Sequence, residues 1–210
     1  MKEKVIIVGD GGHAKIVIDI LEQYGNIEIV GITTKQPEKK EFFGYPIIGT
    51  DEILAFYFNK GIRNVAIGIG GFTNNNLRKE IFIKIKKLGF NVISAIHPNA
   101  TIASTAKLGE GVTIFGGVVI NPDVVIGNNC IIATCSSIDH ETIIEDHSLI
   151  SAGVTVGANT IIKKGTLCAL GSKIISGVTI GENSLIAAGA VVVNNIEKNT
   201  RVYGIPAKIK

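Results

Sequence analysis

Histidine is scarce in this chain, and one of the four histidines stands between two carboxylic acids. The four are His13, His97, His140 and His147. Imidazole has an ordinary pKa close to neutrality, so it can take a proton from an attacking nucleophile. Asp139 and Glu141 flank His140, and either carboxylate could orient the ring and stabilise its cation. The sequence therefore places a candidate general base at His140; the alternative is a solvated histidine at a turn.

A glycine-rich turn near the N-terminus is the second candidate site. The run Val5-Ile6-Ile7-Val8 is typical of a buried parallel strand, and Gly9-Asp10-Gly11-Gly12-His13 follows it. Glycines let the backbone approach a phosphate closely, and the helix expected next directs free N–H groups toward it. We expect a phosphate-bearing ligand at Gly9, Gly11 and Gly12. The alternative is that Gly11 and Gly12 only permit tight packing of the strand against the helix.

The end of the second expected strand argues against a dinucleotide as that ligand. Dinucleotide-binding turns are followed, about 20 residues later, by an acid that binds a ribose hydroxyl. Here the strand at 28–32 runs into Thr33-Thr34, without Asp or Glu. We therefore expect a phosphate-bearing ligand that is not a dinucleotide.

The segments around the glycine turn alternate between strand and helix patterns. Helical spacing runs from residue 16 to about Tyr24, further strand patterns lie at 28–32 and 65–69, and 76–88 has the pattern of another helix. Strand, glycine turn, helix and strand form a βαβ unit. The sequence predicts a small Rossmann-like α/β domain over residues 1–95.

A six-residue repeat organises the rest of the chain. Of the sixteen positions from Ile102 to Val192 in steps of six, fifteen are Ile, Leu or Val, and the exception is Cys168. The residue four places after each is small or β-branched, as a narrow corner requires. Such a period is typical of three-sided coils of parallel β-structure, in which three hexads close one coil. A β-helix is therefore predicted for residues 96–210.

Composition excludes several other classes of protein. Apolar residues make up 46% of the 210, but no apolar run approaches the length of a membrane span. The formal net charge is +3, without a basic stripe bearing aromatics, which disfavours nucleic-acid binding. The first ten residues lack a signal-peptide core, so we expect a cytoplasmic protein. The three cysteines, Cys130, Cys135 and Cys168, are expected to be buried free thiols.

Four motifs carry a resemblance to a known family. They are Val8-Gly9-Asp10-Gly11-Gly12-His13-Ala14-Lys15, Ile96-His97-Pro98-Asn99-Ala100, Ser137-Ile138-Asp139-His140-Glu141, and Tyr203-Gly204-Ile205-Pro206-Ala207-Lys208. With the hexads, they resemble the left-handed β-helix acyltransferases, and more closely the bacterial sugar acyltransferases that pair a small Rossmann-like domain with this helix. That group includes N-acetyltransferases of nucleotide-linked amino sugars and O-acetyltransferases of sialic acid.

The resemblance implies an acetyl-CoA-dependent enzyme, with a homotrimer binding the cofactor in the groove between neighbouring β-helices. His140 would be the catalytic base and Glu141 would polarise it. The residues implied near the cofactor are His147, Leu149, Gly157, Lys164 and Lys208. Residues 1–95 would bind the sugar or nucleotide sugar, with His13 and Thr33 joining the three glycines.

The chain departs from the family pattern at two positions. A second histidine, nine residues after the base, contacts the acetyl group in the family, whereas here that position is Leu149 and His147 lies seven residues after His140. His147 could substitute for it or could be an exposed structural histidine. The family often has Asn seven residues before the base, where this chain has Ala133. No metal site is expected, because His140 and His147 offer at most two of the three ligands that a zinc enzyme needs.

The sequence therefore predicts acetyl transfer to the amine of a nucleotide-linked amino sugar. Two alternatives stay open. One is O-acetylation of sialic acid or another sugar. The other is a trimeric binding protein with impaired catalysis, which Ala133 and Leu149 would suit.

Overall fold

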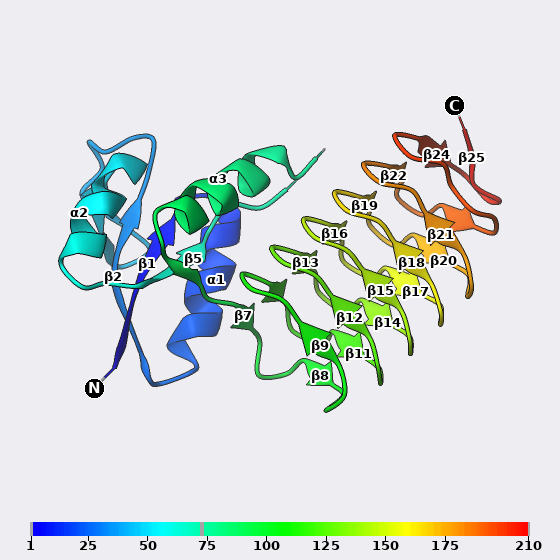
Figure 1. Ribbon diagram of the computed structural model, residues 1–210, viewed down its shortest axis with the longest axis horizontal. Coiled ribbons are helices and arrows are strands. Elements are labelled where there is room, and N and C mark those ends of the chain that lie inside the picture. Colours follow the sequence, from blue (N-terminus) through cyan, green and yellow to red (C-terminus); the bar gives the residue numbers. More distant parts are fainter. Residues whose placement is uncertain (1, 72–73, 210) are drawn as a thin grey trace. The chain divides into compact units, whose positions relative to one another are not determined.

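The computed structural model describes residues 2–71 and 74–209, and the chain divides into two compact units (Figure 1). The first unit comprises Met1–Gly70 and Leu77–Ala95, and the second comprises Gly71–Asn76 and Ile96–Lys210. The segment 71–76 thus groups with the hexad region, although it lies within the N-terminal part of the sequence. Periodicity could not reveal this, because the segment carries no hexad.

The first unit is built on one mainly parallel sheet. Its strands lie in the order β3-β4-β2-β1-β5-β6, with only β3 antiparallel to its neighbour. Their bounds are β1 Glu3–Val8, β2 Ile27–Thr33, β3 Glu41–Phe42, β4 Tyr45–Gly49, β5 Asn64–Ile67 and β6 Asn91–Val92. The last four residues of β1 are fully buried, as expected for a central parallel strand.

Helices cover both faces of this sheet. They are α1 Gly12–Glu22, the 3-10 turn η1 Asp51–Ile53, α2 Leu54–Asn59 and α3 Asn76–Lys87. α1 packs its buried residues against one face, and α2 and α3 pack against the other. The predicted βαβ pattern is confirmed, with α1 ending at Glu22, two residues before the expected Tyr24. The elements between residues 34 and 64 were not predicted, because none has a long periodic run.

The strand order reverses between β1 and β5. From β1 the chain proceeds outward through β2 to β4, and then returns to β5 and β6 on the other side. In open parallel sheets the crevice at the carboxyl ends of the strands, where the order reverses, is where ligands bind. The glycine turn after β1 lies at this point.

The second unit is a parallel β-helix of two-residue strands. Strands 18 residues apart pair in parallel, as Thr113 does with Ile131, so three hexads form one coil. The end of the helix departs from this rule, because β22 pairs with β24 across 16 residues and β25 is antiparallel to β24. We call the three sides sheets C, D and E. Sheet C contains β7 Ala95–Ile96, β10 Thr113–Ile114, β13 Ile131–Ile132, β16 Leu149–Ile150, β19 Leu167–Cys168, β22 Leu185–Ile186, β24 Arg201–Tyr203 and β25 Lys208–Ile209.

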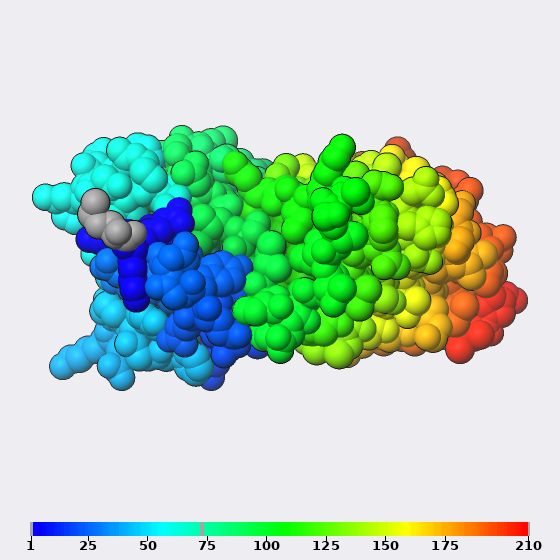
Figure 2. All heavy atoms as spheres, turned by 90° about the horizontal axis from the view of Figure 1, so that it is seen from below, coloured from blue at the N-terminus to red at the C-terminus, as the bar shows by residue number. Residues whose placement is uncertain are grey.

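The other two sides follow the same rule. Sheet D contains β8 Thr101–Ile102, β11 Val119–Ile120, β14 Ser137–Ile138, β17 Thr155–Val156, β20 Lys173–Ile174 and β23 Val191–Val192. Sheet E contains β9 Lys107–Leu108, β12 Val125–Ile126, β15 Ile143–Ile144, β18 Ile161–Ile162 and β21 Thr179–Ile180. In Figure 2 the coils of this unit form bands that change from green to red toward the C-terminus.

The core of the β-helix consists of the predicted hexad residues. From Ile114 to Val192 every one of them is at most 3% exposed. The small residues four places later are also buried at the corners, for example Ser136 and Thr142. Cys130 and Cys168 are buried free thiols as expected, and burial raises the pKa of Cys168 to about 12. Cys135 is also free, but it is exposed at a corner rather than buried.

Outward-facing apolar residues are more buried on sheet C than on sheets D and E. On sheet C, Ile131, Leu149 and Leu167 form an apolar ladder at 18-residue spacing and are at most 5% exposed. On sheets D and E, outward residues such as Val119 and Ile143 remain 38% and 39% exposed. Among the described residues, no helix has both the length and the apolarity to cross a bilayer.

Adjacent residues on β20 test the assignment of inward and outward positions. Ile174 is 3% exposed and faces the core, whereas its neighbour Lys173 faces solvent. Ile174→Ala should lower the free energy of unfolding by about 2–5 kcal/mol, because it removes buried methyl groups and leaves a cavity. Lys173→Ala should change it by less than about 0.5 kcal/mol. Urea unfolding followed by circular dichroism measures both, and equal effects would contradict the assignment.

Candidate functional site

The corner between sheets D and E carries the candidate acid–base group. Asp139, His140, Glu141 and Thr142 connect β14 to β15, and we call them the His140 corner. Thr142 points into the core and donates its hydroxyl to the Gly157 carbonyl oxygen. The side chains of His140 and Glu141 are 52% and 58% exposed. The corner therefore presents an imidazole at the surface on a rigid turn.

Glu141 is the acid that contacts the imidazole. His140 Nδ1 lies 3.1 Å from Glu141 Oε2. An ionised carboxylate only accepts hydrogen bonds, so Nδ1 carries the proton and Nε2 is left as the basic nitrogen. This is the arrangement in which a histidine can take a proton at one nitrogen while a carboxylate stabilises the charge formed on the ring.

Asp139, in contrast, accepts a hydrogen bond from the backbone. Its Oδ1 accepts hydrogen bonds from the His140 N–H at 2.8 Å and from Asn121 Nδ2 at 3.0 Å. These bonds stabilise the ionised carboxylate and lower the pKa of Asp139, the backbone N–H contributing most. Of the two acids that flank His140 in sequence, one shapes the corner and the other contacts the ring.

The backbone of Glu141 explains how two adjacent residues meet. Glu141 has a φ of +57°, in the left-handed region that non-glycine residues rarely adopt. The same position one coil earlier is Asp123, and one coil later it is Asn159; both are residue types better suited to this conformation. A glutamate held there is a local outlier, and such outliers favour a functional explanation. Asn159 Nδ2 also lies 3.4 Å from Glu141 Oε2.

Gly157 lies at the same corner, one coil after Asp139. A Cβ at Gly157 would come within 2.5 Å of the Ser176 backbone nitrogen. The close approach of successive coils therefore requires glycine there. Of the residues expected near the cofactor, Gly157 is the one on the same corner as His140.

His147 lies at a different corner, between sheets E and C. Its Nδ1 is 3.0 Å from Asn129 Nδ2, and because an amide nitrogen only donates, the proton of this imidazole sits on Nε2. The His147 carbonyl accepts a 2.8 Å hydrogen bond from Asn75 Nδ2, which comes from the segment 71–76. His147 and His140 therefore sit at opposite ends of strand β15 and are not brought together within the chain.

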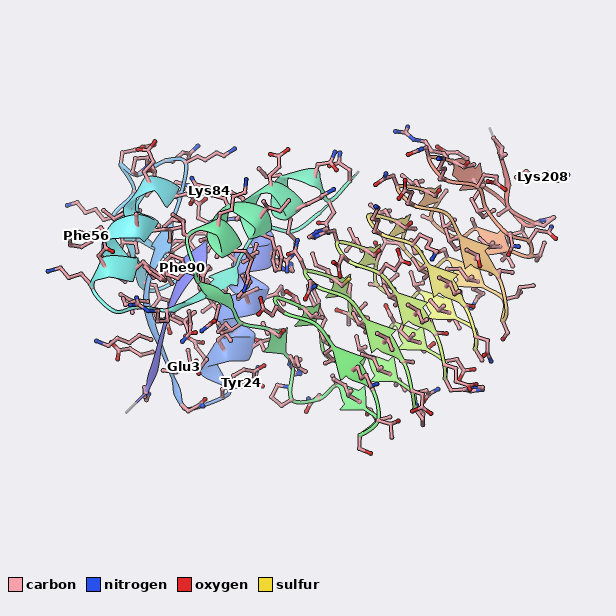
Figure 3. The ribbon with its side chains drawn as sticks, viewed as in Figure 1. Glu3, Tyr24, Phe56, Lys84, Phe90 and Lys208 are labelled. Carbon is pink, nitrogen blue, oxygen red and sulfur yellow. The ribbon has the colours of Figure 1, made fainter. Side chains whose placement is uncertain are left out.

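The other expected cofactor residues lie at separate places on the β-helix. Lys164 borders a hollow of about 520 Å³, which it shares with Lys163, Lys198, Glu145, Glu182 and Glu197. Lys164 Nζ lies 3.3 Å from Glu182 Oε2. Leu149 is 5% exposed in the apolar ladder of sheet C. Lys208 is exposed on β25, at the C-terminal end of this unit (Figure 3).

In the first unit, two glycines bring the turns after β1 and β5 together. A Cβ on Gly9, whose φ is +103°, would lie 2.6 Å from Ile69 Cγ1. A Cβ on Gly68 would lie 2.8 Å from Ala14 Cβ. Gly11 and Gly12 have open space around them, so tight packing does not require glycine at those two positions. The alternative that Gly11 and Gly12 only permit tight packing is therefore not supported, and the glycine that packing requires in this turn is Gly9.

A buried arginine fixes His13 at this edge of the sheet. Arg78 is 1% exposed, and its Nη1 donates to the carbonyl oxygens of Ile67 and Ile69. The same nitrogen lies 3.3 Å from His13 Nε2, which must accept because guanidinium only donates. Burial and the neighbouring Arg78 charge lower the pKa of His13 to about 3. His13 is therefore neutral and carries its proton on Nδ1.

Thr33 lies beside the glycine turn. The Gly9 N–H donates to the Thr33 carbonyl oxygen at 3.0 Å, and the Thr33 hydroxyl donates to Asp51 Oδ1 at 2.5 Å. Asp51, Arg78 and Asn75 were all missed by sequence reasoning, because none stands in a motif and each is brought in by tertiary packing. Within residues 2–71 and 74–209, no three His, Cys, Asp or Glu side chains are grouped as metal ligands.

Comparisons with known proteins agree with both units. The PglD N-terminal domain model matches residues 4–85, and the bacterial transferase hexapeptide model matches residues 105–140. A β-helix of hexapeptide coils joined to a Rossmann-like unit defines the class as a hexapeptide-repeat transferase. The fold expected from the sequence, an α/β domain followed by a left-handed β-helix, is confirmed.

Three relatives identify the family. A variant of GDP-perosamine N-acetyltransferase from Caulobacter crescentus, with one histidine replaced by alanine and in complex with CoA and GDP-perosamine, is 32% identical with a TM-score of 0.92. The match covers 99% of this chain and 96% of that one. The acetyltransferase domain of PglB from Neisseria gonorrhoeae, in complex with acetyl coenzyme A, is 26% identical over the full length of both chains, with a TM-score of 0.90.

The third relative is a curated enzyme, the UDP-N-acetylbacillosamine N-acetyltransferase of Bacillus subtilis. It is 28% identical over 117 residues, which are 53% of this chain and 51% of that enzyme. The match thus spans about half the length of the curated relative. Taken together with the solved relatives, these similarities show that the chain belongs to the family of hexapeptide-repeat sugar acetyltransferases.

The shifted pKa of His13 predicts a pH-dependent stability. Between pH 6.5 and about pH 3 the unfolded chain binds a proton at His13 that the folded chain does not bind. Stability should therefore fall as the pH falls from 6.5, by about 2 kcal/mol at pH 5. His13→Gln keeps an acceptor for Arg78 but cannot titrate, so its loss of stability over this range should be smaller by that amount. Urea unfolding at pH 7 and pH 5 measures the difference; parallel losses would contradict it.

Proposed function

We propose that this protein transfers the acetyl group of acetyl-CoA to the amine of a nucleotide-linked amino sugar, with His140 as the general base. The observation that carries the proposal is the contact of His140 Nδ1 with Glu141, made by a glutamate in the left-handed conformation. In the neutral imidazole this contact places the proton on Nδ1 and leaves Nε2 as the basic nitrogen, on a side chain that is 52% exposed.

The relatives support this choice of substrates. The Caulobacter protein was solved with CoA and a GDP-linked amino sugar, in a form lacking one histidine, and the Neisseria domain was solved with acetyl coenzyme A. The curated Bacillus enzyme is named as an N-acetyltransferase of a UDP-linked sugar. An amine acceptor is thus favoured over a hydroxyl. We also propose that the enzyme is cytoplasmic.

The proposed acetyl transfer uses two side chains, His140 and Glu141. As the neutral amine attacks the thioester carbonyl carbon, Nε2 takes one N–H proton, and the carboxylate of Glu141 stabilises the imidazolium that forms. When the C–S bond breaks, the imidazolium can return that proton to the departing thiolate. The amide product and free CoA leave His140 in its starting tautomer, so the proton balance closes.

The first unit is proposed to bind the acceptor. Gly11 and Gly12 are exposed with open space around them, at the start of α1 and at the reversal point of the sheet. Backbone N–H groups there can bind a phosphate. His13 is held beside this turn by the contact of its Nε2 with Arg78 Nη1 at 3.3 Å. These features suit the diphosphate and sugar of a nucleotide-linked acceptor.

The working form is proposed to be a homotrimer. The outward faces on either side of the His140 corner expose β-branched residues: Val119 on sheet D, and Val125 and Ile143 on sheet E, at 37–39%. Contact between these faces would bury apolar surface that a single chain leaves in water. It would also place a neighbouring chain beside His140, which suits a cofactor groove between subunits reaching His147, Leu149, Gly157, Lys164 and Lys208.

Substitutions at the His140 corner test the catalytic roles. His140→Ala should lower kcat about 100- to 10,000-fold, because the general base is lost. Glu141→Gln should lower kcat about tenfold, since it keeps the size of the side chain but weakens its stabilisation of the imidazolium. The matched control is Asp139→Asn, which removes the other flanking charge and keeps the Oδ1 acceptor, so its kcat should stay close to wild type.

Release of CoA from acetyl-CoA measures these rates over a panel of nucleotide-linked 4-amino and hydroxyl-only sugars. If His140→Ala transfers acetyl at the wild-type rate, the general base is elsewhere. If only the hydroxyl acceptors are acetylated, the proposed amine chemistry is wrong. If wild type releases no CoA with any acceptor, the enzymatic assignment itself fails.

The proposed interface makes a prediction about assembly. Ile143→Glu places a charge in the apolar face and should convert a trimer of about three times 22.2 kDa into single chains, with loss of activity. Leu170→Glu is the control, because Leu170 is 61% exposed and lies at the corner between sheets C and D rather than at the His140 corner. Sedimentation velocity distinguishes the two. The interface is wrong if wild type is monomeric or if Ile143→Glu remains trimeric.

A further inference from the structure

We propose that Asp51, held by Thr33, is the residue that binds a ribose hydroxyl of the nucleotide-linked acceptor. It supplies the acid that the sequence lacks at the end of the second strand. The inference rests on the proposed function, since it assumes that the first unit binds a nucleotide. It adds a specificity-determining residue that lies in none of the motifs of the chain.

The position of Thr33 defines where a ribose would lie. In sheets of this topology the phosphates bind at the turn after the first strand, and the ribose lies over the end of the next strand, where an acid accepts its hydroxyl. Here the turn begins at Gly9, whose N–H donates to the Thr33 carbonyl oxygen at 3.0 Å. Thr33 and Thr34 are at most 3% exposed and carry no charge.

The chain brings the missing acid to this place from a different strand. β4 runs parallel to β2, with Gly49 paired to Thr33, and the Thr34 N–H donates to the Gly49 carbonyl oxygen at 3.0 Å. Two residues beyond Gly49, at the start of η1, Asp51 directs its Oδ1 to within 2.5 Å of the Thr33 hydroxyl oxygen. The carboxylate therefore lies at the carboxyl end of β2, where an acid of β2 itself would otherwise be expected.

The remaining hydrogen-bonding capacity of Asp51 suits a hydroxyl donor. The Thr33 hydroxyl occupies Oδ1, and in the described part of the chain Oδ2 forms no hydrogen bond or ion pair. Asp51 is partly exposed, so a ligand can reach it. An ionised carboxylate only accepts, which matches a ribose O–H. The acid of the glycine turn, Asp10, is engaged with Lys39 at 3.2 Å, which leaves Asp51 as the better placed acceptor.

A purely structural role for Asp51 is the competing explanation. Its bond to Thr33 ties β4 to β2, so loss of the carboxylate could act through stability alone. Asp51→Asn separates the two roles, because the amide oxygen still accepts from Thr33 while the charge and the second acceptor are lost. Glu52→Gln is the matched control: it removes the same charge from the adjacent residue, which is exposed and lies in the same turn.

The test is calorimetric titration of the full chain with GDP and UDP, each compared with its 2′-deoxy and 3′-deoxy forms. Wild type should bind the better ribonucleotide about tenfold more tightly than at least one of its deoxy forms, as expected for a hydrogen bond to a charged acceptor. Asp51→Asn should lose this preference: it should bind the ribonucleotide about tenfold more weakly and that deoxy form as wild type does. Glu52→Gln should keep the wild-type preference.

The outcomes separate this inference from the proposed function. If Asp51→Asn keeps the preference for the ribonucleotide, Asp51 does not bind the ribose. If it binds both forms more weakly and its melting temperature also falls, the role is structural and the inference is wrong. If wild type acetylates nucleotide-linked amino sugars but shows no ribose preference, the inference alone fails. If wild type binds neither nucleotide and acetylates none of their sugars, the proposed function fails as well.

Discussion

The parallel hydrogen-bond ladder between residues 18 apart is the constraint on which the β-helix depends. It requires every coil to have the same length, so that each inward aliphatic residue stacks on the one before it. It also repeats every corner in register, and the third residue of many corners is held in the left-handed region. Most coils fill that position with Gly, Asn or Asp, which accept this conformation at low cost.

That repeated corner determines which side chains surround His140. Three positions depart from the usual choice with Glu141, His147 and Cys135, and only Glu141 follows a histidine directly. The ladder pairs the strands on both sides of this corner, Glu141 adopts the left-handed conformation between them, and its carboxylate lies 3.1 Å from the imidazole. Asp139 closes the same turn through the His140 N–H. Of the two acids that flank His140, one therefore contacts the backbone and the other contacts the ring.

In the first unit, an accessible turn lies next to a tightly packed sheet. Gly9 lets the turns after β1 and β5 approach one another, while the exposed Gly11 and Gly12 keep the start of α1 accessible. Arg78 is buried beneath this edge and contacts His13, and burial together with the Arg78 charge lowers the pKa of His13 to about 3. The start of α1 is therefore exposed above a firmly packed base.

The sequence by itself determined the elements whose pattern is local. The hexads predicted the coils and their buried column, and the run from Val5 to Val8 predicted the central strand. Tertiary structure decided what depends on contacts between distant residues: that Glu141 rather than Asp139 contacts His140, and that Asp51 lies at the end of β2. The physical reason is that periodicity records which face of an element is buried, whereas a site also depends on which side chains different strands and turns bring together.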